Sequence, residues 1–149
     1  MKRQSERMRA GFTLIELLVV MIILAILAAF AIPRVIGRTD DARRGRALSD
    51  IKSLGTALDM YKTENGSYPS TEQGLAALRI APTSDPIPKA WNGPYLKDPI
   101  QADPWGNPYI YANPSEHGGD YDLSSNGADG QPGGSGNNSD LTSWEGSEN

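Results

Sequence analysis

The chain has 149 residues, no cysteine and a formal net charge of −4. This length allows one domain with an extended appendage, and the missing cysteine excludes a disulfide framework, a thiolate metal site and a cysteine nucleophile. The negative charge disfavours general attraction to nucleic acid, so no nucleic-acid partner is expected. The charge is unevenly spread: nine of the 14 basic residues lie in the first 46 positions and none follows Lys97, whereas acidic residues continue to Glu148.

The most apolar segment comprises residues 12–32, which contain a single charged residue, Glu16. As a helix it would be roughly 30 Å long, the thickness of a bilayer core. Basic residues flank both of its ends, so the preference for positive cytoplasmic flanks leaves its orientation open. A signal peptide cut after Ala31 and a plain membrane anchor are the simpler interpretations. The segment exceeds the roughly 7–15 residues of a signal-peptide core, and neither interpretation explains a costly intramembrane carboxylate.

Residues 11–16 read Gly-Phe-Thr-Leu-Ile-Glu at the start of this apolar segment. This hexapeptide resembles the G-F-T-x-x-E signature of type IV prepilins in sequence, position and context. The resemblance implies that residues 1–11 are a leader peptide and that a membrane-embedded prepilin peptidase cuts between Gly11 and Phe12. It also implies N-methylation of Phe12. Glycine before the cut bond suits such a peptidase because it is the least obstructive residue.

Cleavage would create a cationic amine on Phe12, with Glu16 about one helical turn further along. If subunits stack with an axial offset, Glu16 of one subunit can meet the terminal amine of a neighbour. That pairing would specify the register of assembly even where its net stabilisation is small. We therefore predict that Glu16 is an assembly residue. The simpler interpretation places its carboxylate in the lipid headgroup region.

The helical pattern resumes after Pro33, with apolar residues at steps of three and four from Ala47 to Tyr61 and a stop signal at Asn65-Gly66. We expect one helix over residues 12–64 whose second part packs on a small sheet. Because proline removes a helical hydrogen bond, two helices joined at residues 33–37 are the alternative. A short helix capped by Ser70 or Thr71 should follow. Strands are predicted at residues 109–111 and 121–123, paired through a turn at residues 113–119.

Motifs further along the chain resemble the major pseudopilins of type II secretion systems. With the N-terminal signature they extend over residues 11–144. They are Tyr61-Lys62, Asn65-Gly66-x-Tyr68-Pro69, Thr71-Glu72-Gln73-Gly74-Leu75, Asp103-Pro104-Trp105-Gly106, His117-Gly118, Asp122-Leu123-Ser124-Ser125 and Gly127-Ala128-Asp129-Gly130.

The resemblance implies an α+β, type IV pilin-like fold, in which a long N-terminal helix packs on a small antiparallel sheet beside a calcium-binding C-terminal loop. Residues 1–11 would be the cleaved leader, 12–32 the transmembrane and filament-core helix, and 33–149 the periplasmic domain. The chain would be a single-pass protein of the bacterial inner membrane.

The implied role is the major structural subunit of a pseudopilus that helps to export folded proteins across the outer membrane. Its partners would be copies of itself, the prepilin peptidase, minor pseudopilins, an inner-membrane platform protein, a secretin and membrane lipid. A type IV pilin for adhesion, motility or DNA uptake is the alternative, although many pilins have a cysteine-bridged C-terminal loop that this chain lacks. An anchored enzyme is not expected, because we find no catalytic motif and interpret His117, the single histidine, as a turn residue.

The oxygen-rich segment 125–140 is the candidate metal site. Asp122 begins an EF-hand-like stretch, but Gly133 occupies the twelfth position, where that loop needs a bidentate Glu. Composition alone would favour a flexible loop without an ion. The pseudopilin resemblance instead implies a Ca²⁺ site. Its predicted ligands are the Asp129 and Asp140 carboxylates, the backbone carbonyls of Asn126 and Gln131, and an oxygen of Ser139, with Asn138 as the alternative to Ser139.

Overall fold

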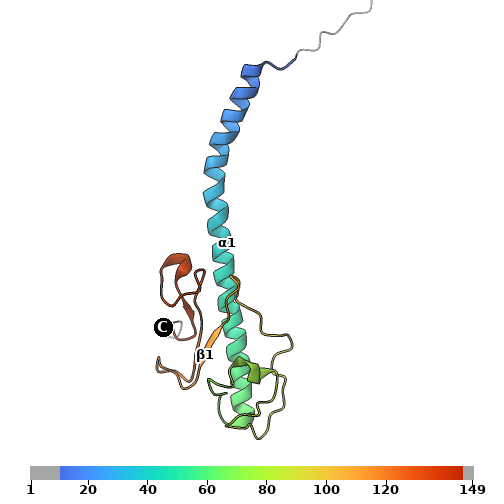
Figure 1. Ribbon diagram of the computed structural model, residues 1–149, viewed down its shortest axis with the longest axis vertical. Coiled ribbons are helices and arrows are strands. Elements are labelled where there is room, and N and C mark those ends of the chain that lie inside the picture. The colour runs from blue at the N-terminus through green and yellow to red at the C-terminus, as the bar shows by residue number, and fades with distance from the viewer. Residues whose placement is uncertain (1–10, 146–149) are drawn as a thin grey trace, which may run out of the picture. The chain divides into compact units, whose positions relative to one another are not determined.

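The structure, a computed structural model, describes residues 11–145, although the side chains of residues 29–38 lie outside the description. The chain divides into two compact units, residues 1–39 and 40–149, which are described separately. The elements in chain order are α1 (Leu14–Asn65), the 3₁₀ helix η1 (Leu75–Leu78), β1 (Ile110–Ala112), β2 (Asp122–Ser125), the 3₁₀ helix η2 (Gly136–Asn138) and β3 (Leu141–Thr142) (Figure 1).

Helix α1 begins two residues after Phe12 and is assigned without a break across Pro33 and Gly37. The single long helix is therefore the prediction that is confirmed, and the two-helix alternative is wrong. Gly66 ends the helix in a left-handed conformation (φ 83°), and its N–H donates to the Lys62 carbonyl (2.7 Å). This glycine terminates α1 because the positive φ carries no steric penalty for it.

Among the residues and side chains that the structure describes, no helix combines the length and the apolar character needed to cross a membrane. Residues 29–32, the end of the predicted membrane segment, have side chains outside this description, and so has the predicted leader apart from Gly11.

In the second unit, one face of α1 supplies six of the 13 buried core residues that the structure describes. The buried helix residues recur at steps of three and four, which places them on a single face. They are Ala47, Ile51, Leu54, Ala57, Leu58 and Tyr61. The same core contains Leu123 from β2 and Leu78 from η1, which are fully buried, and Tyr111 from β1. The predicted packing of a helix on a small sheet is therefore confirmed.

The sheet is antiparallel with the strand order β1-β2-β3. Tyr111 pairs with Leu123, and Ser125 pairs with Leu141. The two predicted strands exist, but each begins one residue later than expected. Strand β3 was not predicted, since two residues carry no periodic signal. Reciprocal contacts hold it: the Ser143 N–H donates to the Leu123 carbonyl (2.8 Å), and the Leu123 N–H donates to Ser143 Oγ (3.1 Å).

The predicted short helix is the 3₁₀ helix η1, which buries Leu75 and Leu78. The turn before it is closed reciprocally. The Gln73 N–H donates to Ser70 Oγ (3.2 Å), and the Ser70 N–H donates to Gln73 Oε1 (3.1 Å). These are the bonds of a capping box, but they close the turn before η1 rather than η1 itself, whose N-cap is Gly74 without a side-chain hydrogen bond. The predicted cap of this helix by Ser70 or Thr71 is therefore wrong.

Leu58→Ala should test the helix–sheet core. Leu58 is fully buried, so the cavity should lower the free energy of unfolding by about 2–5 kcal/mol. Met60→Ala on the same helix is the control, because Met60 is 51% exposed and should change stability by about 0.5 kcal/mol or less. Denaturant unfolding followed by tryptophan fluorescence measures both, and equal losses would contradict the packing described here.

Candidate functional site

The N-terminal site combines an accessible peptide bond with a capped helix. Gly11, Phe12 and Thr13 precede α1 in irregular, exposed backbone. Thr13 Oγ1 accepts a hydrogen bond from the Glu16 N–H (3.3 Å), which caps the first turn. The predicted cleavage point therefore lies outside the helix, and the cap fixes where the helix starts relative to it.

The first part of α1 presents an apolar surface without a partner in the described chain. Phe12 and all large apolar side chains through Leu27 are between 47% and 84% exposed. Glu16 lies among them and is exposed as well. Soluble monomers rarely expose a continuous apolar surface of this kind, which typically marks a membrane or protein interface.

The C-terminal loop brings the predicted metal ligands onto one short segment. The Gly133 N–H donates to Asp140 Oδ2 (2.8 Å), and the Gln131 N–H donates to Asp129 Oδ1 (3.1 Å). Asn126 turns its side-chain amide to the Gly130 carbonyl (3.2 Å). Within the described part of the chain, no three acidic or histidine side chains gather around a metal-sized site. A cation here would therefore need backbone oxygens as well as the two carboxylates.

One atom of this loop supports the fit of a cation. Asp140 Oδ1 is buried and has no hydrogen-bond partner. A buried carboxylate oxygen without a partner is costly, and such atoms are rare in folded proteins. Ca²⁺ accepts carboxylate and carbonyl oxygens in irregular geometry, so this donor set suits it. The ligand set itself stays a prediction.

Two side chains of α1 contact this loop, and neither contact was predicted from the sequence. Arg44 Nη1 donates to the carbonyls of Gly136 (3.0 Å) and Ser139 (3.2 Å), and Asn137 Nδ2 donates to Asp40 Oδ2 (2.7 Å). Figure 1 shows the orange-red loop beside α1. Contacts across more than 90 residues leave no local pattern by which a sequence could reveal them.

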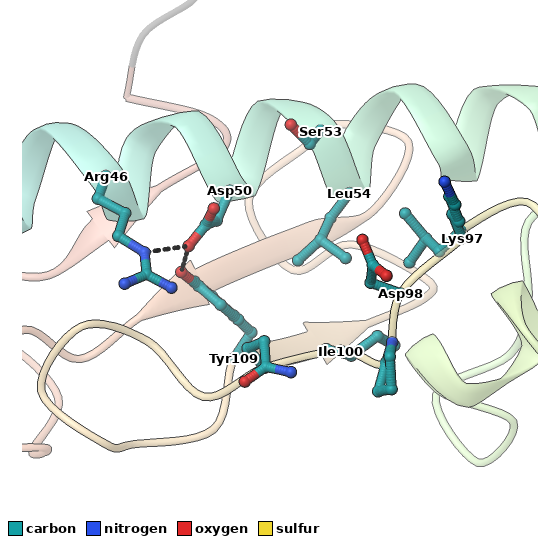
Figure 2. Close-up of a pocket in the computed structure, with 11 residues that line it drawn as sticks. Arg46, Asp50, Ser53, Leu54, Lys97, Asp98, Ile100 and Tyr109 are labelled. Atoms are coloured by element: carbon teal, nitrogen blue, oxygen red, sulfur yellow. Dashed lines mark hydrogen bonds and ion pairs between the residues drawn. The ribbon is translucent and has the colours of Figure 1, made fainter.

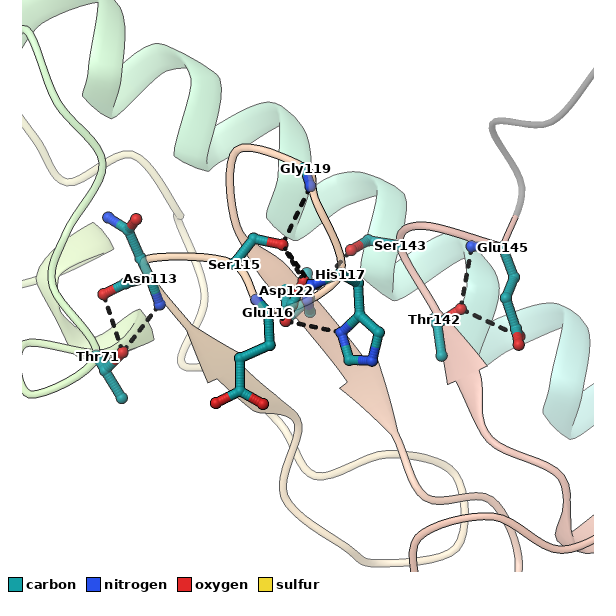
Figure 3. Close-up of polar contacts among 11 residues, drawn as sticks. Thr71, Asn113, Ser115, Glu116, His117, Gly119, Asp122, Thr142, Ser143 and Glu145 are labelled. Carbon is teal, nitrogen blue, oxygen red and sulfur yellow. Dashed lines mark hydrogen bonds and ion pairs between the residues drawn. The ribbon is translucent and has the colours of Figure 1, made fainter.

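His117 lies in the connection between β1 and β2, as the interpretation of it as a turn residue expected, and its acidic partner is Asp122, at the start of β2. His117 Nδ1 lies 2.9 Å from Asp122 Oδ2 (Figure 3). The imidazole also stacks on Trp144, with 4.0 Å between ring centroids. The Ser115 hydroxyl donates to Asp122 Oδ1 (2.6 Å) and the Glu116 N–H donates to Asp122 Oδ2 (2.9 Å).

Burial raises the pKa of the Asp122 carboxyl, but hydrogen bonds from Ser115, His117 and Glu116 outweigh that effect and hold the pKa below its ordinary value. The arrangement stabilises a charged carboxylate under the β1–β2 turn. The same histidine, stacked on Trp144, brings this turn into contact with the C-terminal segment.

A cavity of about 280 Å³ lies between α1 and residues 96–101 (Figure 2). Asp50 on its wall accepts a hydrogen bond from the Tyr109 hydroxyl (3.0 Å) and lies 3.7 Å from Arg46. Burial, followed by the bond to Asp50, raises the pKa of the Tyr109 hydroxyl, so Tyr109 stays a neutral donor. Arg46 therefore has an acidic partner within its own chain. So does Arg43, which forms an ion pair with Asp40 (3.5 Å).

Comparison with known proteins places this geometry in context. Residues 34–144 match the family described as "Type II secretion system (T2SS), protein G", and residues 7–32 match the "Prokaryotic N-terminal methylation motif". The chain is 51% identical over 142 residues to type II secretion system core protein G of Pseudomonas aeruginosa, covering 95% of this chain and 99% of that one. It is 44% identical to the Escherichia coli K12 protein of the same name, covering 95% and 94%.

A solved structure, the major pseudopilin from the type 2 secretion system of enterohaemorrhagic Escherichia coli, has the same fold. The TM-score is 0.64 at 38% identity, with 74% of this chain and 93% of that chain covered. The pilin-like α+β fold is confirmed, and the comparisons favour the pseudopilin prediction over the type IV pilin alternative. The family matches span both the N-terminal motif and the helix–sheet domain, and the chain belongs to the type II secretion system protein G family of major pseudopilins.

Proposed function

We propose that this chain is the major structural subunit of a type II secretion pseudopilus, and that it polymerises after prepilin peptidase cuts between Gly11 and Phe12 and methylates the new terminus. Its role is structural rather than catalytic. The observation that carries the proposal is the apolar helix surface from Phe12 to Leu27, which is exposed on the single chain. Lipid covers this surface before assembly, and neighbouring subunits cover it afterwards.

Glu16 supplies the specificity that an apolar surface lacks. Apolar side chains pack in many registers, whereas a carboxylate in an apolar setting needs one particular partner. The terminal amine of Phe12 on a neighbouring subunit is that partner. The match of residues 7–32 to the N-terminal methylation motif supports the processing step that creates the amine.

The location follows from the same segment. Residues 12–32 anchor the subunit once in the bacterial inner membrane, and residues 33–149 lie in the periplasm. Besides copies of itself, the subunit would contact the prepilin peptidase, minor pseudopilins, the platform protein and the secretin. The family match supports these partners as a class, since a pseudopilus subunit acts within such a machine.

Ca²⁺ binding in the C-terminal loop is the second part of the proposal. The buried, unpartnered Asp140 Oδ1 supports it, together with Asp129 on the same loop. Asp129 and Asp140 would hold the ion, with carbonyls of Asn126 and Gln131 and an oxygen of Ser139 completing the set. A bound ion would neutralise the two carboxylates and close the loop, a role that a disulfide has in other small domains.

Mass spectrometry of the chain purified from cells should find a mature N-terminus at Phe12 carrying one methyl group. Gly11→Val should prevent cleavage, because a branched side chain obstructs the peptidase beside the bond. A chain that keeps residues 1–11, or one trimmed after Ala31, would contradict the proposed processing.

Glu16→Gln should leave membrane insertion intact and impair assembly. Removing one partner of a buried ion pair costs about 3–5 kcal/mol, which corresponds to about a hundredfold or more in an assembly equilibrium. Membrane fractionation measures insertion, and electron microscopy of sheared filaments measures assembly. Glu72→Gln, an exposed acid of the second unit, is the control. Normal filaments from the Glu16 variant would overturn its assigned role.

Asp129→Ala should lower the melting temperature in calcium and remove the stabilisation that added calcium gives the wild type. A ligand at about 100 times its Kd stabilises by about 2.7 kcal/mol, so the response should be easy to measure by thermal unfolding in EDTA and in calcium. Asp41→Ala, which removes an exposed acid of α1, should keep the full response. A wild-type chain that does not respond to calcium would rule out the site.

A further inference from the structure

The C-terminal loop is held to α1 by two side chains one helical turn apart. Arg44 Nη1 bridges the Gly136 and Ser139 carbonyls at 3.0 and 3.2 Å, and Asp40 Oδ2 accepts a hydrogen bond from Asn137 Nδ2 at 2.7 Å. Together these contacts reach three of the four consecutive residues 136–139. Residues four apart on a helix lie on the same side, so Asp40 and Arg44 act on the loop together.

These two residues continue the core-facing stripe of α1. Ala47 and Ile51, three and seven residues after Arg44, are buried in the core. The steps of four, three and four from Asp40 to Ile51 keep all four residues on one face of the helix. The polar end of that face therefore meets the loop, while its apolar part meets the sheet.

The segment that Arg44 holds is fixed on its other side as well. The Ala128 N–H donates to the Asn137 carbonyl (3.2 Å). Gly127 adopts a positive φ of 64°, and a Cβ at that position would lie 2.8 Å from the Ser139 carbonyl oxygen. Residues 136–139 are thus clamped between α1 and the start of the same loop.

The clamped segment leads directly into Asp140. The Gly133 N–H binds Asp140 Oδ2 at 2.8 Å, and Asp140 Oδ1 is buried without a hydrogen-bond partner. The direction of this carboxylate therefore depends on the backbone of Ser139, whose carbonyl Arg44 fixes.

We propose that Arg44 is a positioning residue for cation binding by the C-terminal loop, with Asp40 as its supporting contact; this inference rests on the proposed calcium site. Arg44 does not bind the ion. It orders residues 136–139 before the ion binds. The entropic cost of ordering Ser139 and Asp140 is then not subtracted from the free energy of binding.

Two physical effects of Arg44 predict opposite results, which makes the proposal testable. A guanidinium beside a cation site opposes cation binding by charge, so if charge dominated, its removal would tighten calcium binding. If positioning dominates, its removal weakens binding. Because a single nitrogen, Nη1, makes both hydrogen bonds, the ammonium of a lysine can replace part of the contact.

The experiment uses the full chain in detergent and compares Arg44→Met with Arg44→Lys. Arg44→Met loses charge and donors, and its calcium Kd from isothermal titration should rise about tenfold or more, the usual effect of losing a group that orients metal ligands. Arg44→Lys should lie closer to the wild type. Hydrogen exchange of residues 136–140 in EDTA should accelerate in the Met variant, while exchange in the β1–β2 ladder stays unchanged.

Arg46→Met is the matched control, since Arg46 lies two residues from Arg44, has a side chain that is 63% exposed, and forms its ion pair with Asp50 (3.7 Å) rather than with Asp40 or the loop. It should keep the wild-type Kd and exchange rates. An Arg44→Met variant with unchanged or tighter calcium binding would overturn this inference and leave the calcium site standing. A wild-type chain that binds no calcium would overturn the site and, with it, the inference.

Discussion

The structure depends on one constraint: α1 carries two apolar surfaces, and the described chain covers only one of them. From Ala47 to Tyr61 the helix packs on the β-sheet and η1 within the same unit. From Phe12 to Leu27 its apolar side chains are exposed. Apolar surface of that extent is stable only when lipid or another chain covers it. The second unit of such a subunit has its own core, whereas the Phe12–Leu27 surface needs a partner. This combination suits a subunit of a filament.

The second unit has no cysteine, so non-covalent contacts must secure its C-terminal third. Three of these contacts join residues that are far apart in the sequence. Strand β3 pairs with β2, the stacked rings of His117 and Trp144 join the β1–β2 turn to the terminal segment, and Arg44 attaches residues 136–139 to α1. Each contact is modest alone, but the three act on one short stretch of chain and so share the entropic cost of ordering it.

Features with a local or periodic cause could be predicted from the sequence. The helix and its end at Asn65-Gly66 follow from apolar spacing and a glycine stop. Strand β3 could not be predicted, because two residues have no period. The contacts of Arg44 and the pairing of His117 with Asp122 depend on tertiary proximity, for which a single sequence carries no signal.

The interpretation of the candidate sites depended more on resemblance than on residue chemistry. Composition alone favoured a flexible 125–140 loop, yet its backbone is folded tightly enough that Gly127 has no room for a Cβ. The orphaned oxygen of Asp140 is a structural argument for an ion that neither composition nor spacing provided. Sequence therefore located the loop, and only the structure shows which of its atoms lacks a partner.

A cation and a disulfide would stabilise such a loop by similar amounts but respond to different conditions. A disulfide typically contributes about 2–4 kcal/mol and is lost on reduction. An ion at about 100 times its Kd contributes about 2.7 kcal/mol and is lost on dilution or chelation. For the proposed calcium site, loop stability would thus follow the ion concentration around the domain. Arg44 would set the concentration at which this happens, since ordering residues 136–139 in advance lowers the entropic cost of binding.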